Sequence, residues 1–82
     1  MKYFTYVLKS AKNKDIYIGS TKNIGNRVKL HNLGRIKSTR GYMPWKLLEY
    51  REFGSRSEAT REERFLKNHQ QKEILKRRYV SA

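Results

Sequence analysis

The stretch "KDIYIGSTKNIGNRVKLHN" at residues 14–32 determines how the whole chain is interpreted. Its first part, "DIYIGS" at 15–20, is rich in β-branched and aromatic residues and predicts a strand. Its second part begins at Asn23, a residue type preferred as a helix N-cap, and Gly34 is a natural helix stop. The sequence therefore predicts a strand followed at once by a short basic helix that contains a single histidine, His31.

Two further stretches resemble strands. Residues 3–9, "YFTYVLK", suit a strand, and the polar residues 10–14 suit a turn, so the first two strands form a predicted antiparallel hairpin. Residues 35–45 contain a glycine, the only proline and many polar groups, which predicts a loop. "WKLLEYREF" at 45–53 predicts a third strand.

Two helices are predicted after the third strand. "SRSE" at 55–58 matches a capping box for a helix over about 56–68, and a final helix is expected from about Gln70 to Tyr79. The predicted fold class is α+β, with a small three-stranded antiparallel sheet flanked by helices in the order β-β-α-β-α-α. At 82 residues, the chain is expected to form a single domain over 1–82.

The composition favours a polyanion as partner. Twenty Lys and Arg against seven Asp and Glu give a formal net charge of +13, which attracts nucleic acid or, as the alternative, an anionic membrane surface. No apolar run approaches the ~20 residues of a membrane span, so no membrane insertion is expected. The N-terminus lacks a signal-peptide layout and cysteine is absent, which favours a cytoplasmic protein without disulfides.

The charge is distributed unevenly along the chain. Six of the seven acids lie in the last 34 residues among basic ones, which predicts an ordinary salt-bridged helix surface there. Between Asp15 and Glu49 there is no acidic residue, so this region is predicted to face phosphates. Its basic residues are Lys22, Arg27, Lys29, Arg35, Lys37, Arg40 and Lys46.

Two tyrosines lie on the predicted hairpin. Tyr6 and Tyr17 are placed so that both could face the same side of the sheet, although tyrosine is common in strands for packing reasons alone. Gly19 is more unusual, because a glycine inside a strand gives up packing and marks a bulge or a close backbone approach.

The first helix carries a second pair of candidates. Arg27 and His31 are four residues apart and therefore share a helix face, near the side that holds Ile24 and Val28. An arginine extended along apolar surface and a histidine packed in the core explain this pair without any function. For the pair taken alone, that interpretation is the favoured one.

The second predicted helix carries a candidate carboxylate. Glu63 lies beside the apolar stripe that includes Ala59 and Leu66, where a carboxylate serves as an ion-pair partner or as a metal ligand. The neighbouring Glu62 is an equal competitor, because helical periodicity does not separate the two. His69 and one other histidine, without cysteine, make a zinc site improbable.

Taken together, these motifs resemble the GIY-YIG nuclease superfamily over about residues 3–78. Thr5-Tyr6-Val7 stands where the first tripeptide is expected, Tyr17-Ile18-Gly19 matches the second in full, and Arg27 to His31 matches the R-x-x-x-H element. "HNLG" and "STRGYMPWKLL" are similar to the small stand-alone bacterial UPF0213 group. "SRSEATREERFLK" resembles the second helix of that group and assigns the family glutamate to Glu63. The first tripeptide departs from the family pattern at both ends but retains its tyrosine.

The resemblance implies a metal-dependent DNA endonuclease that hydrolyses phosphodiester bonds. By analogy, the catalytic residues are Tyr6, Tyr17, Arg27, His31 and Glu63, and Glu63 also binds one divalent ion, Mg²⁺ or Mn²⁺. Tyr17 is predicted to take the proton of the attacking water, and Tyr6 to help position that water. Arg27 is predicted to neutralise a phosphate oxygen, with His31 beside it.

The predicted partner is DNA, with branched and single-stranded forms as candidate substrates, in repair or processing. Lys22, Lys29, Lys37 and Arg40 are predicted from charge alone as nucleic-acid contacts. No stable protein partner is predicted, and a dimer is left open. Two alternatives remain at this point: a non-catalytic nucleic-acid-binding module that keeps the nuclease fold, and a basic ribosome- or membrane-associated structural protein.

Overall fold

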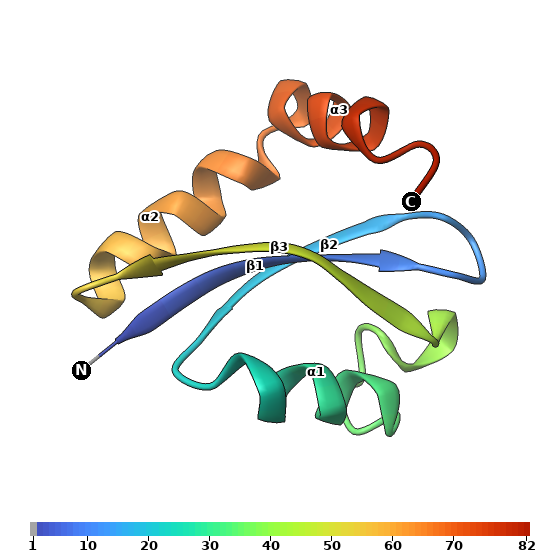
Figure 1. Ribbon diagram of the computed structural model, residues 1–82, viewed down its shortest axis with the longest axis horizontal. Helices are drawn as coiled ribbons and strands as arrows, with labels where there is room; N and C mark the ends of the chain where they lie inside the picture. The colour runs from blue at the N-terminus through green and yellow to red at the C-terminus, as the bar shows by residue number, and fades with distance from the viewer. Residues whose placement is uncertain (1) are drawn as a thin grey trace.

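A three-stranded antiparallel sheet forms the middle layer of the molecule (Figure 1). The computed structural model describes residues 2–82, and its strands are β1 (Tyr3–Ser10), β2 (Ile16–Thr21) and β3 (Trp45–Phe53). Their order in the sheet is β2-β1-β3, so the strand that comes first in the chain is the central one. Both pairings are antiparallel, which confirms the predicted hairpin and the predicted α+β fold class.

Helices cover both faces of this sheet. Figure 1 shows α1 (Ile24–Asn32) and the short 3₁₀ helix η1 (Arg40–Tyr42) on one face, with α2 (Arg56–Lys67) and α3 (His69–Arg78) on the other. The predicted order β-β-α-β-α-α is confirmed, apart from η1, which lies in a segment predicted as irregular loop. That segment forms a short turn because its backbone N–H groups bond to carbonyls three or four residues back.

The two main helices begin where the sequence predicts. The Asn23 side chain accepts a hydrogen bond from the backbone N–H of Asn26 at the start of α1. The Ser55 side chain accepts one from the N–H of Glu58 at the start of α2. Each cap satisfies a backbone donor that has no partner within the helix, so the elements on both sides of the sheet start at defined positions.

The central strand supplies both cores, because its side chains alternate between the two faces. Val7 packs with Ile16, Ile18 and Leu75 on the α2 and α3 side. Tyr6 and Leu8 pack with Trp45 on the α1 side, where Tyr17 joins them. Tyr6 and Tyr17 therefore do share one face of the sheet.

Polar side chains of β1 connect the sheet to α2 and to the end of α3, on the face opposite α1. The Thr5 hydroxyl donates a hydrogen bond of 2.7 Å to the backbone carbonyl of Ala59 in α2. The buried Lys9 ammonium donates to the carbonyls of Tyr79, at 2.6 Å, and Val80, at 3.3 Å, just beyond α3. This contact, which we call the Lys9 clamp, joins the first strand to the end of the last helix.

The helices are short and strongly polar. Across residues 2–82 none of them combines the length and the hydropathy that a membrane crossing requires.

Candidate active site

The α1 face of the sheet buries a tyrosine against a glycine. Tyr6 is 1% exposed and lies opposite Gly19 in the β1–β2 pairing. A Cβ atom on Gly19 would lie 2.6 Å from the Tyr6 hydroxyl oxygen, far inside van der Waals contact. Gly19 therefore marks a close backbone approach, and the irregularity in the sheet lies between Val7 and Leu8, where β1 pairs with β3.

The Tyr6 hydroxyl begins a chain of buried hydrogen bonds. It lies 2.9 Å from Nε2 of His31, and Nδ1 of His31 lies 2.8 Å from the Thr39 hydroxyl. The Thr39 hydroxyl donates to the carbonyl of Ile36 at 3.4 Å, so its oxygen accepts the Nδ1 proton. Nε2 is then unprotonated and accepts the Tyr6 proton, which assigns one tautomer to His31.

The segment that carries Thr39 is itself held in place. The indole Nε1–H of Trp45 donates to the Thr39 backbone carbonyl at 2.9 Å. Asn32, at the end of α1, brackets the Trp45 backbone, accepting from its N–H at 2.6 Å and donating to its carbonyl at 2.9 Å. The fully buried Thr39 is therefore positioned by the third strand as well as by its own turn.

Burial keeps both rings of this chain neutral. Burial raises the pKa of Tyr6 to about 12, opposed by a hydrogen bond from the Arg27 guanidinium and by its positive charge, and reinforced by Tyr17 and Glu63. Burial, together with the positive charge of Arg27, lowers the pKa of His31 to about 4. At neutral pH Tyr6 is a phenol and His31 is an uncharged imidazole.

Tyr17 lies beside this chain but is only partly buried. Its ring meets His31 edge-on with a centroid separation of 5.0 Å, and Trp45 at 6.1 Å. In residues 2–82 its hydroxyl has no hydrogen-bond partner, whereas the Tyr6 hydroxyl is already engaged. The two tyrosines are therefore chemically different, because only Tyr17 has a hydroxyl available to water.

Arg27 contributes an unsatisfied donor to the same face. Its Nε is buried and has no hydrogen-bond partner in the described part of the chain. Its charge acts on both Tyr6 and His31, so the guanidinium lies within electrostatic reach of them. A buried donor without an acceptor is unusual in folded proteins, and at a functional site it suits an anionic oxygen of a ligand.

Glu63 lies on α2, on the face of the sheet opposite α1 (Figure 1), and its side chain reaches β2. Its Oε1 accepts a hydrogen bond of 2.7 Å from the Ser20 hydroxyl, and its Oε2 pairs with the Lys67 ammonium at 2.7 Å. Its charge contributes to the raised pKa of Tyr6, so the carboxylate is close enough to affect the tyrosine. Ser20, at the end of β2, thus orients Glu63 toward the edge of the sheet.

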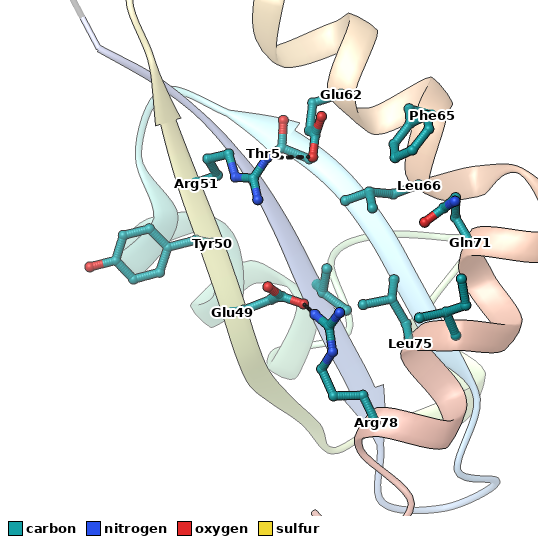
Figure 2. A pocket seen from close by; sticks show the side chains of 12 residues that line it. Thr5, Glu49, Tyr50, Arg51, Glu62, Phe65, Leu66, Gln71, Leu75 and Arg78 are labelled. Carbon is teal, nitrogen blue, oxygen red and sulfur yellow. Dashed lines mark hydrogen bonds and ion pairs between the residues drawn. The ribbon is translucent and has the colours of Figure 1, made fainter.

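The competing carboxylate, Glu62, has a different partner. It pairs with Arg51 of β3 at 3.2 Å, in a hollow of about 190 Å³ between the sheet, α2 and α3. Figure 2 shows this ion pair, and a second one between Glu49 and Arg78 at 3.5 Å, on the face opposite α1. The three-dimensional contacts therefore separate two residues that periodicity could not.

The donor set around Glu63 suits one particular class of cation. Residues 2–82 contain no group of three or more His, Cys, Asp and Glu side chains that could hold a metal ion together. Mg²⁺ does not need such a group, because it keeps several waters and often binds through one carboxylate and the substrate's phosphate. A single oriented carboxylate fits Mg²⁺ or Mn²⁺ and does not fit zinc.

The four basic residues predicted to contact nucleic acid are all exposed, and they come from different segments of the chain. Lys22 follows β2, and its ammonium lies 5.6 Å from the centroid of the Tyr3 ring. Lys29 is two positions from Arg27 on α1, which points it away from that residue. Lys37 and Arg40 lie in the segment between α1 and β3.

Four residues that the sequence analysis did not single out support this site. Thr39 and Trp45 lie within the quoted "STRGYMPWKLL" stretch, but neither periodicity nor a motif role separated them from their neighbours. Asn32 ends α1 and holds the Trp45 backbone, and Ser20 holds the Glu63 carboxylate. Both roles depend on contacts between residues that are distant in sequence.

Comparison with known proteins agrees with this geometry. The family model of the GIY-YIG catalytic domain matches residues 2–78, nearly the whole chain. The chain therefore belongs to the GIY-YIG family, a family of nucleases, which confirms the resemblance seen in the sequence.

Within that family the chain is similar to UPF0213 proteins. It is 33% identical over 75 residues to UPF0213 protein OB0043 of Oceanobacillus iheyensis, covering 90% of this chain and 86% of that protein. It is 38% identical over 65 residues to UPF0213 protein CPE1444 of Clostridium perfringens, covering 78% and 69%. The solution NMR structure of UPF0213 protein BH0048 from Bacillus halodurans is 35% identical, with a TM-score of 0.56, covering 92% of this chain and 82% of that one.

Proposed function

We propose that this protein is a metal-dependent DNA endonuclease that hydrolyses phosphodiester bonds in DNA repair or processing in the cytoplasm. Family membership supports nuclease chemistry in general. The observation that carries the proposal is the buried, unpartnered Nε of Arg27 on the face that holds Tyr6, Tyr17 and His31. A phosphodiester supplies the anionic oxygen that this donor lacks.

In this proposal Arg27 binds the phosphate that is cleaved. Its guanidinium donates to a non-bridging oxygen and neutralises the charge that develops on that oxygen as the bond to the attacking water forms. Because its Nε is buried, its interaction with that charge is stronger than it would be in water. Burial, and with it the same charge, lowers the pKa of His31, so the neighbouring ring stays uncharged and does not compete for the phosphate.

Tyr17 is the residue proposed to accept the proton of the attacking water. Its hydroxyl is uncommitted within residues 2–82, whereas the Tyr6 hydroxyl donates to His31. Tyr6 has a pKa of about 12 and remains a phenol, so it fits a role in orienting groups rather than in accepting a proton. His31, in contact with both rings, fixes their relative orientation.

Glu63 is the proposed ligand of the divalent ion. Ser20 holds one carboxylate oxygen, and Lys67 provides a positive charge at the other. When bound, the ion would stabilise negative charge on the phosphate and on the leaving oxygen. Ser20 and Lys67 therefore hold the Glu63 carboxylate in place, with one contact at each oxygen.

The test compares two neighbouring carboxylates. Purified wild type, Glu63→Gln and Glu62→Gln are incubated with supercoiled plasmid and with a branched DNA, in Mg²⁺ or in chelator. Glu63→Gln should lower the cleavage rate by at least about 100-fold, equivalent to about 3 kcal/mol of transition-state stabilisation. Glu62→Gln removes the same charge from the same helix but only the exposed pair with Arg51, so its cleavage rate should stay within about threefold.

The alternative, a binding module that keeps the fold, gives a different result. Wild type would bind both DNAs equally well with Mg²⁺ and with chelator and would cleave neither. Equal loss of cleavage in Glu62→Gln and Glu63→Gln would also reject the assignment of Glu63, since the two differ in their contacts and not in their charge.

A further inference from the structure

The outer side of α2 carries three arginines that we call the arginine stripe: Arg56, Arg61 and Arg64. All three are exposed, and they line one shallow hollow of about 540 Å³ together with Ser57 and Thr60. The hollow contains no acidic side chain. The stripe lies in the part of the sequence where mixed charges predict an ordinary salt-bridged surface.

The acidic residues of the chain are engaged elsewhere. Among residues 2–82, six of the seven form ion pairs, and the seventh, Glu58, accepts a hydrogen bond from the Ser55 hydroxyl. None of these ion pairs involves an arginine of the stripe. The predicted salt-bridged surface is therefore found on α3 and at Lys67, but not on the outer side of α2. The six paired acids are Asp15, Glu49, Glu52, Glu62, Glu63 and Glu73.

The stripe is continuous with the candidate active site. Arg56 also lines a smaller hollow of about 60 Å³ with Ser20 and Lys22. Ser20 is the residue that holds the Glu63 carboxylate, so this hollow adjoins the proposed metal ligand. From Arg56 to Arg64 the helix rises about 12 Å, because eight residues advance about 1.5 Å each. The stripe ends level with Glu63, because Arg64 directly follows it in α2, so a phosphate chain that passes Glu63 has a line of cations beside it.

We propose that the arginine stripe binds the phosphodiester backbone of duplex DNA on one side of the cleavage site. This proposal rests on the proposed function, because it takes the site beside Glu63 as the place where DNA is cut. Arginine suits the role, since its planar guanidinium donates two parallel hydrogen bonds to a phosphate. Of the four contacts predicted from the sequence, Lys22 lines the smaller hollow beside Arg56, whereas the other three lie on α1 or in the segment after it.

The experiment measures duplex binding as a function of salt. A fluorescent 20-base-pair duplex is titrated in chelator with wild type, with Arg56→Gln/Arg64→Gln and with Lys14→Gln/Arg77→Gln. Each phosphate contact contributes about −0.9 to the slope of log affinity against log salt, so the stripe variant should lose about 1.8 from the slope. The control also removes two exposed charges that have no ion pair among residues 2–82, and it should lose less than half as much.

A second measurement does not depend on a substitution. In ¹H–¹⁵N spectra of the wild type, addition of the same duplex should shift the backbone amides of Ser57 and Thr60, within the stripe. The amides around Ile74 and Arg77 on α3 should shift much less.

Circular dichroism of both double variants checks that their helix content is unchanged.

The outcomes separate this proposal from the proposed function. Equal slopes for the two double variants, or unshifted Ser57 and Thr60 amides, would overturn the stripe even if the wild type cleaves DNA. A reduced slope for the stripe variant alone would support it, even if Mg²⁺ brings no cleavage and the endonuclease proposal fails.

Discussion

The two faces of the sheet differ in chemistry, although the same strand builds both. On the α1 face, β1 contributes Tyr6 to a buried polar chain that continues through His31 to Thr39. On the opposite face, β1 contributes Val7 to a small apolar cluster that is closed by Leu75 of α3. In this chain with 37% hydrophobic residues, the face covered by α2 and α3 thus serves mainly for packing, and the face covered by α1 also holds oriented polar groups.

The difference extends to the edges of the two faces. The hollow on the face opposite α1 is rimmed by the ion pairs Arg51–Glu62 and Arg78–Glu49, so its charges satisfy each other (Figure 2). On the α1 face the Arg27 Nε has no partner within residues 2–82. The comparison teaches that a well-lined hollow is not by itself a good candidate for chemistry, because the charges of this one are already neutralised.

The largest expected effect comes from the closest contact on the polar face. Gly19→Ala would place a Cβ atom 2.6 Å from the hydroxyl oxygen of the buried Tyr6, whose ring has no room to move. We expect a loss of about 3 kcal/mol in the free energy of unfolding, the upper part of the range for overpacking. Urea denaturation measures it. Gly41→Ala, where a Cβ meets nothing within 4 Å, is the matched control and should change stability by less than about 0.5 kcal/mol.

Acidification should affect the polar face selectively. The pKa of His31 is lowered from 6.5 to about 4 in the folded protein, so between these values the unfolded chain binds a proton that the folded one does not. The contribution of His31 to stability is therefore complete above pH 6.5 and is lost as the pH falls toward 4. We expect a loss of about 2 kcal/mol between pH 7.5 and pH 5 from this residue.

The measurement is urea denaturation at the two pH values. His31→Gln should remove most of the difference between them. Ile18→Val, a conservative change on the apolar face, should cost about 1 kcal/mol at both values and leave the pH dependence intact. A wild-type stability that does not change between pH 7.5 and pH 5 would contradict the assignment of a buried neutral histidine.

The smallest expected effect on stability concerns Thr39. Thr39→Val removes the acceptor of the His31 Nδ1 proton and should cost about 1 kcal/mol, whereas Thr39→Ser keeps the hydroxyl and should cost less. The sharper observation is the tautomer of His31, read from its ¹⁵N chemical shifts. Wild type and Thr39→Ser should show a protonated Nδ1, and Thr39→Val a mixture of both tautomers. The same tautomer in all three proteins would show that Thr39 does not set it.

Much of the fold could be predicted because its signals are local. Alternation along β1 put Tyr6 on one face and Val7 on the other, and the N-caps Asn23 and Ser55 marked where helices begin. A spacing of four residues also put Arg27 and His31 on one helix face. These inferences use only the periods of strands and helices, which the sequence displays directly.

The rest of the site depends on contacts between distant residues. Glu62 and Glu63 both flank the apolar stripe of α2, and only Ser20 and Arg51, more than ten positions away, distinguish them. Thr39 lies in an irregular segment that has no period from which a burial could be inferred. The charges near the arginine stripe are mixed in the sequence, but proximity along the chain does not determine which charges pair in space.

The Lys9 clamp has a consequence for the order in which this segment folds during synthesis. β1 leaves the ribosome before both of its partner strands, and the carbonyl of Tyr79 that Lys9 binds follows 70 residues later. The central strand therefore stays unpaired at one edge until β3 emerges. The Lys9 ammonium keeps water as its partner until the residues after α3 have been made. Folding of this segment is completed only when its last helix has been made, which leaves β1 exposed to chaperones or to aggregation during elongation.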